Sequence, residues 1–135
     1  MKLIAAYADT TSDSDDVSPS HVRLANDADP YQLALAGVQR IDLHFPKFSD
    51  GRAFSQAFVL RRRLGFKGEL RATGDVLVDQ LPHMQRSGFD LAVLRADQDM
   101  AVAKRVLAAY PGHDIGHYQG DALDTRPHFI DARQA

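Results

Sequence analysis

Apolar and polar residues alternate most cleanly over residues 40–45, RIDLHF. The apolar side chains at 41, 43 and 45 fall on one face of an extended chain, and Asp42 and His44 fall on the other. This period of two predicts a strand with one buried face. Pro46 directly follows and ends the strand, because proline cannot donate to a sheet ladder.

The rest of the chain continues as alternating strands and helices. Residues 67–73 alternate in the same way, and residues 90–94 form a more apolar run. Helical periodicity follows each strand, and each helix is expected to begin at an aspartate that caps it. The expected helices run from Asp50 to Leu64, from Asp75 to Gly88, and from Asp97 to Pro111, with a short helix from Asp29 to Gly37 and a further strand at 115–119.

Strands separated by helices of this length predict an α/β fold of three to four parallel strands joined in βαβ units. Central strands of a doubly wound sheet are buried on both faces and are continuously apolar. The first two strands instead carry Asp42, His44, Glu69 and Arg71 on the face away from the apolar side. The pattern therefore fits a partial (β/α) barrel, which we favour, or a small open sheet covered on one face.

Composition suggests where the domain begins and ends. Residues 9–20 are acidic, rich in Ser and Thr and poor in apolar anchors, so residues 1–20 are expected to be a flexible segment. Residues 21–120 form the expected domain, and 121–135 an irregular tail. The apolar run at the N-terminus is too short for a signal peptide or a membrane span, so we expect a cytoplasmic protein.

Charge and cysteine content limit the chemistry. The formal net charge is -2, which gives no overall positive field for binding nucleic acid or an anionic membrane. The chain has no cysteine, so disulfides, cysteine-ligated metals and thiol catalysis are excluded. His113 and His117 have a spacing that suits a metal on a helix, but the flanking glycines at 112 and 116 favour a strand or loop. No metal site is expected, and the cofactor is left unknown: if the protein takes part in redox chemistry, the electron carrier must sit elsewhere or be a bound cofactor.

Ligands of parallel α/β folds bind beyond the carboxyl ends of the strands. Two strand-end loops there lead into helices, whose first N–H groups favour anions such as phosphate, sulfate or sulfite. The ligand-binding candidates are Lys47, Asp50, Gly51, Arg52, Thr73, Gly74 and Asp75. The competing interpretation is structural: Asp50 and Asp75 are N-caps that occupy the donors an anion would use.

The polar strand face offers a second set of candidates, His44 with Asp42 and Glu69 with Arg71. A carboxylate beside an imidazole can tune a general base, which makes these four residues the catalytic candidates. They are equally compatible with a structural salt-bridge network. The arginines at 61–63 lie on a helix and are expected to form a solvated face or a docking patch.

Two blocks carry a resemblance: FPKFSDGR at 45–52, and GELRATGDVL at 68–77 followed by Asp79-Gln80. Over residues 22–120 the chain resembles a bacterial family of short proteins of unknown function that are often labelled as oxidoreductases of sulfite reduction. Carried over by position, the motif residues are Phe45, Pro46, Phe48, Asp50, Gly51, Arg52, Ser55, Arg61, Glu69, Arg71, Gly74, Asp75, Asp79, Gln80 and Arg86. Ala53 stands where a glycine is expected, and Ser87 where many relatives have cysteine.

The resemblance implies an accessory protein of assimilatory sulfite reduction. Such a protein would bind the sirohaem sulfite or nitrite reductase, or a small oxyanion or phosphorylated ligand at the strand-end loops. An alternative is a small enzyme that uses the His44/Asp42 and Glu69/Arg71 groups. A third is an oligomerisation module, such as a homodimer, whose polar sheet face meets a second copy.

Overall fold

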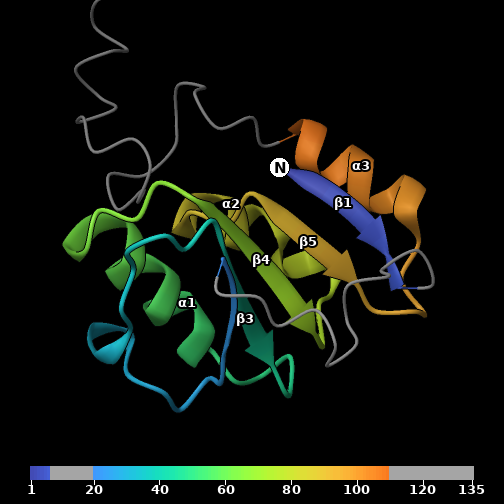
Figure 1. The fold of residues 1–135 in the computed structure, drawn as a ribbon. Helices are drawn as coiled ribbons and strands as arrows, with labels where there is room; N and C mark the ends of the chain where they lie inside the picture. The colour runs from blue at the N-terminus through green and yellow to red at the C-terminus, as the bar shows by residue number, and fades with distance from the viewer. Residues whose placement is uncertain (7–19, 110–135) are drawn as a thin grey trace, which may run out of the picture.

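The computed structural model describes residues 1–6 and 20–109, and its centre is a sheet of five parallel strands. The spatial order is β1-β5-β4-β3-β2. All the arrows in Figure 1 point the same way, so the carboxyl ends of the strands meet at one edge. The strands are β1 (Lys2–Ala5), β2 (His21–Leu24), β3 (Arg40–Phe45), β4 (Glu69–Gly74) and β5 (Leu91–Leu94). The predicted α/β class and the parallel strands are confirmed.

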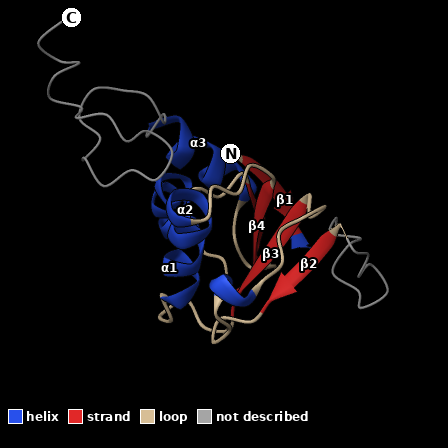
Figure 2. Cartoon of the chain, turned by 60° about the vertical axis from the view of Figure 1, so that its left-hand side comes forward, coloured by secondary structure: helices blue, strands red, loops and turns tan. Residues whose placement is uncertain are grey.

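The helices cover one face of this sheet. Figure 2 shows α1 (Arg52–Phe58), α2 (Leu81–Ser87) and α3 (Met100–Ala109) together on one side of the strands. β1 and β2 form opposite edges of the sheet and do not pair with each other. Of the two expected architectures, the small open sheet is therefore the one observed, and it has five strands rather than three or four.

The alternation of β3 and β4 determines which residues reach the helices. Ile41, Leu43, Leu70 and Ala72 are fully buried on the helix side. The register places Asp42 opposite Arg71 on the other, helix-free face. β5 is buried along its whole length, as expected of an apolar strand between two neighbours.

β1 extends the sheet beyond the expected domain. Lys2–Ala5 pairs with Leu91–Leu94, although the sequence placed residues 1–20 in a flexible segment outside the domain. Four residues with a single apolar-polar step are too short a pattern to identify a strand. The expected strand at 115–119, the tail at 121–135 and the histidines at 113 and 117 lie outside the described residues.

The helix after β3 has its expected length but changes its winding. α1 continues into η4, a π-helical turn over Val59–Arg63, and Gly65 follows with φ +68°. The wider turn lets the N–H groups of Leu64 and Phe66 reach the carbonyl oxygens of Val59 and Leu60. The short helix capped by Asp29 is confirmed at its start, but it is the three-residue 3-10 helix η3 (Pro30–Gln32) and does not reach residue 37.

Arg61 does not lie on the solvated arginine face that the sequence predicted, because its side chain is buried. Its guanidinium donates to the carbonyl oxygens of Phe66, Gly68 and Gly88, and its Nη2 lies 2.6 Å from Asp90 Oδ2. The side chain is only 8% exposed. Arg61 thus ties the helix layer to the loops that begin β4 and β5, a role that helical periodicity does not reveal.

Within the described residues, no helix is both long enough and apolar enough to cross a membrane.

Candidate functional site

A concavity of about 730 Å³ opens on the helix-free face, at the carboxyl ends of the strands. All five strands or the loops that follow them contribute to its wall. This is the position at which parallel α/β folds place their ligands. The lining residues are Ala6 after β1; Arg23, Leu24 and Ala25 of β2 and its loop; Asp42 and His44 of β3; Arg71, Thr73 and Gly74 of β4; and Val93, Leu94, Arg95 and Ala96 of β5 and its loop.

A buried ion pair lines the concavity between β3 and β4. Arg71 donates from Nε and Nη2 to the two carboxylate oxygens of Asp42, at 3.0 and 2.6 Å. Nε of Arg40 lies 3.1 Å from Asp42 Oδ1 on the side away from the strand ends. The carboxylate of Asp42 is therefore shared by two guanidinium groups, which fixes the position of the Arg71 side chain.

This arrangement separates the two catalytic pairs that the sequence suggested. The carboxylate of Asp42 forms ion pairs with arginines and does not contact His44. Nδ1 of His44 lies 3.5 Å from Thr73 Oγ1 on the neighbouring strand. Glu69 lies opposite Arg40 at the start of β4, two register positions before Arg71, and is not among the lining residues. Of the four catalytic candidates, Asp42, His44 and Arg71 share the concavity.

Gly74 ends β4 in a conformation that glycine makes possible. Its φ is +93°, and a Cβ there would collide with the carbonyl oxygen of Phe45 and lie 2.7 Å from Cε1 of His44. The chain can therefore turn beside the His44 ring without pushing it away. Gly74 and Thr73, both predicted ligand-binding residues, line the concavity next to His44.

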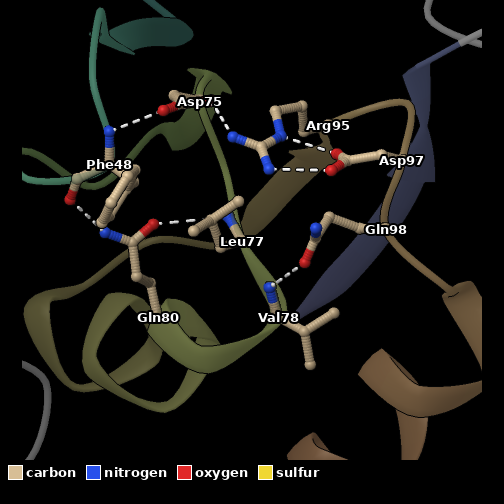
Figure 3. A network of polar contacts seen from close by, with 8 residues as sticks. All are labelled: Phe48, Asp75, Leu77, Val78, Gln80, Arg95, Asp97 and Gln98. Carbon is tan, nitrogen blue, oxygen red and sulfur yellow. Dashed lines mark hydrogen bonds and ion pairs between the residues drawn. The ribbon is translucent and has the colours of Figure 1, made fainter.

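The loops that follow β3, β4 and β5 are joined through Asp75 (Figure 3). Its Oδ2 accepts from the backbone N–H of Phe48 at 2.7 Å, and its Oδ1 accepts from Nη1 of Arg95 at 2.6 Å. Arg95 in turn donates from Nε and Nη2 to both oxygens of Asp97. Three loops far apart in the sequence are thereby held together along one rim of the concavity.

These contacts shift the pKa values of Asp75, Asp97 and Arg95. The guanidinium of Arg95, and next the N–H of Phe48, lower the pKa of Asp75. Arg95 also lowers the pKa of Asp97 to about 2, and these carboxylates raise the pKa of Arg95. The carboxylates therefore stay ionised at neutral pH and keep the Arg95 side chain in place.

Two predicted helix caps are wrong for the same reason. Asp75 is used by Arg95 and Phe48, and Asp97 by Arg95, so neither caps a helix. Gln80 and Gln98 instead accept from the first N–H groups around η5 (Val78–Gln80), at Leu77 and Val78 (Figure 3). Asp99 accepts from Ala101 and Val102 at the start of α3.

In the first strand-end loop, Asp50 binds Arg52 and also accepts from Nδ2 of Asn26, which lies after β2, at 2.6 Å. Asp50 Oδ1 accepts from the backbone N–H of Arg52, and both carboxylate oxygens accept from the Arg52 guanidinium. Arg52 lowers the pKa of Asp50 to about 2. Gly51 is the N-cap of α1 and the helix has no side-chain cap, so the predicted cap at Asp50 is wrong, although the Asp50 carboxylate does occupy the N–H group of Arg52. The candidates Lys47, Asp50, Gly51 and Arg52 are not among the residues that line the concavity.

Comparison with known families identifies the chain. The family described as a bacterial protein of unknown function (DUF934) matches residues 21–129. The chain belongs to this family. The match confirms the predicted resemblance to a bacterial family of unknown function, and it covers β2 and every described element after it. No curated protein and no solved structure gives a significant match to this DUF934 member.

Among the lining residues of the DUF934 chain that were not predicted as site residues are Arg23, Val93 and Arg95. Arg23 and Val93 face the concavity through the alternation of β2 and β5, and Arg95 directly follows β5. Arg95 could have been predicted as a site residue, because it directly follows a predicted strand. Arg23 lies in a four-residue strand, and Val93 resembles any core residue, so only the sheet order brings them to the site.

Proposed function

We propose that this protein is an accessory protein of assimilatory sulfite reduction that binds a small anionic ligand in the strand-end concavity and serves the sirohaem sulfite or nitrite reductase. The observation that carries the binding part is the convergence of all five strand ends on one concavity lined by Arg23, Arg71 and Arg95. The resemblance of the two sequence blocks to proteins labelled for sulfite reduction supports the pathway.

The ion-paired carboxylate of Asp42 favours a ligand-binding role of the concavity over a catalytic one. A general base needs a group that is able to accept a proton, and the carboxylate of Asp42 is occupied by Arg71 and Arg40. The pair is better suited to holding a guanidinium in a fixed orientation at the wall. The positive charge of guanidinium groups at such a wall attracts phosphate, sulfate and carboxylate groups.

A second candidate function is that of a small enzyme with His44 as its general base. His44 is exposed within the concavity, beside the Thr73 hydroxyl. This candidate requires a turnover that His44→Asn abolishes while the variant keeps the melting temperature of the wild type. An equal loss of folding and activity would assign His44 a structural role instead.

Deleting the gene in its native bacterium tests the proposal. We expect slow growth with sulfate or sulfite as the only sulfur source and normal growth with cysteine. Ala96→Trp, which places a large side chain in the concavity, should fail to restore growth, whereas Ala101→Trp on the exposed surface of α3 should restore it. Tagged wild-type protein should also co-purify with the sulfite reductase. Equal growth on all three sulfur sources, with no reductase bound, overturns the proposal.

A further inference from the structure

Positive charge is concentrated in the helix layer. Residues 51–68 and 80–89, which include α1, η4 and α2, hold six of the 16 Lys and Arg residues and none of the 18 Asp and Glu residues. The rest of the chain therefore combines ten cations with 18 carboxylates. Although the net charge is -2, this layer has a local positive field that attracts acidic groups.

Two arginines of this layer are exposed and form no ion pair. Arg52 and Arg61 are used in ion pairs with neighbouring aspartates. Arg62 and Arg63 are exposed in η4, and no carboxylate of the described residues pairs with either. Cζ of Arg62 lies 5.3 Å from the ring centre of Phe58, a cation-π contact that positions this guanidinium. The two groups are therefore available to carboxylates of another molecule.

A groove of about 440 Å³ lies between α1 and α2, and Phe58 is part of its wall. Phe54 and Val59 also line it, and all three of these apolar side chains are half-buried. The ring of His83 stacks on Phe54, with ring centroids 3.9 Å apart. Partial burial, and next the charge of Arg86, lower the pKa of His83, so the ring is mostly neutral at pH 7. The groove therefore offers an aromatic surface on which an apolar side chain would lose water.

We infer that this groove is the docking site of an acidic, amphipathic segment of a partner protein. Apolar side chains of the segment enter beside Phe58 and His83, and its carboxylates pair with Arg62 and Arg63. An amphipathic helix binds in a hydrophobic groove in this manner. The groove and the concavity lie on opposite faces of the sheet (Figure 2), so the inference goes beyond the proposed function.

A protein segment fits this surface better than other polyanions do. A nucleic acid gains its affinity from many phosphate contacts, and two unpaired arginines on a chain of net charge -2 provide few of these. A groove between two helices accepts a protruding side chain, which the surface of an anionic membrane does not present. The apolar lining and the adjacent arginines together match a segment that carries both leucine-like and acidic side chains.

Fluorescence anisotropy with defined peptides tests the inference. The probe is a labelled helical peptide of glutamates with leucines at spacings of three and four residues. One control peptide has alanine in place of leucine, and a second has lysine in place of glutamate. We expect the probe to bind the wild-type protein about tenfold more tightly than either control. Binding should weaken strongly toward about 1 M NaCl, where the Debye length falls to about 3 Å.

A matched pair of double variants locates the charges. Arg62→Glu/Arg63→Glu should weaken the probe about tenfold or more, because two favourable contacts become repulsive. Lys104→Glu/Arg105→Glu makes the same change of charge on the exposed surface of α3 and should leave the affinity within about twofold. Circular dichroism verifies that both variants are folded.

A second pair of variants tests the groove itself. Ser55 is exposed and lines the groove, so Ser55→Trp should block it and abolish binding of the probe. Ala101→Trp on the exposed surface of α3 should bind the probe as the wild type does.

Several results overturn the inference. Equal binding of the probe and the alanine peptide shows that the groove accepts no apolar side chain. Equal binding by the wild type and Arg62→Glu/Arg63→Glu shows that the arginines are not used. Absence of probe binding, or equally tight binding of an oligothymidylate, excludes the acidic protein segment.

The sulfite reductase can then be examined as the partner. Co-purification with the wild type and with Lys104→Glu/Arg105→Glu, but not with Arg62→Glu/Arg63→Glu, would identify the reductase as the protein that docks here. A reductase that binds none of these forms counts against the proposed function, whereas the peptide titrations decide the docking site independently.

Discussion

Arg71 of β4 and Asp42 of β3 form a bidentate ion pair that is almost inaccessible to solvent, with 2% and 4% of the two residues exposed. The two strands are neighbours in register, so the pair joins side chains 29 positions apart in the sequence. Burial of two charges is costly, and their hydrogen bonds offset this cost only while both partners are present. The wall of the concavity therefore depends on both residues.

Removal of one partner should destabilise the fold strongly. Asp42→Ala leaves Arg71 buried without its carboxylate, and we expect a loss of about 3–5 kcal/mol in the free energy of unfolding, measured by urea denaturation. The double variant Asp42→Leu/Arg71→Met should recover part of this loss, because it removes the buried guanidinium of Arg71 and leaves only that of Arg40, which is 14% exposed, without the Asp42 carboxylate. Glu69→Ala is the control on the same face and should cost less than about 1 kcal/mol. A loss equally small in Asp42→Ala would show that the pair is not buried as described.

Gly74 should tolerate alanine less well than Gly65 does. Both have positive φ, which costs an alanine about 1–2 kcal/mol. At Gly74 the added Cβ also collides with the Phe45 carbonyl, whereas nothing lies within 4 Å at Gly65. We expect about 2–5 kcal/mol for Gly74→Ala, since crowding adds about 1–3 kcal/mol. Equal melting temperatures of the two variants would refute the close approach of β3 and β4 at this end.

Arg61 should behave as a core residue and Arg63 as a surface residue, although they are two positions apart. Arg61→Ala leaves the carbonyl oxygens of Phe66, Gly68 and Gly88 without their shared donor, which should cost at least about 2 kcal/mol. Arg63 is exposed, so Arg63→Ala should change the stability by no more than about 0.5 kcal/mol. Chemical denaturation of both variants measures the difference. Similar values would favour the solvated face expected from the sequence.

The contribution of Arg95 should disappear in acid. Arg95 lowers the pKa of Asp75 and brings that of Asp97 to about 2. A carboxylate with a lowered pKa in the folded state stabilises the protein above its ordinary pKa near 4 and loses this effect as the pH falls toward 2. Arg95→Gln should therefore melt below the wild type at pH 7 and approach it between pH 4 and pH 2. Arg105→Gln, an exposed control, should show no such convergence. A constant deficit at all pH values would contradict the ion-pair assignment.

Much of the fold was predictable from local patterns. The alternation around Asp42 and His44 determined both the strand and the face to which these residues point, since the side-chain period of a strand is two. Gly65 and Gly88 correctly ended two helices, because their positive φ values suit glycine. Short segments gave no usable period, so β1 and its place beside β5 were missed.

The errors at Asp75 and Asp97 have one cause. A loop aspartate before a helix has the same sequence signature whether it caps that helix or binds a residue of another loop. Here Arg95, 20 positions after Asp75, competes successfully for both carboxylates because it carries a full charge and a planar fork of donors. For Asp75 the local pattern contains no information about that competitor, whereas for Asp97 the competitor is only two positions away in the same loop.

The sequence by itself determined that the chain alternates between strands and helices, that the sheet is parallel, and that Asp42, His44, Arg71 and Thr73 share a polar face, because strand periodicity and connection length are local properties. Only the tertiary structure decided which of these residues contact each other. Sheet order and register paired Asp42 with Arg71, brought Arg23 and Val93 to the same concavity, and joined Asp75 to Arg95. These relations join residues that are 20 or more positions apart, and they depend on the packing of the whole sheet.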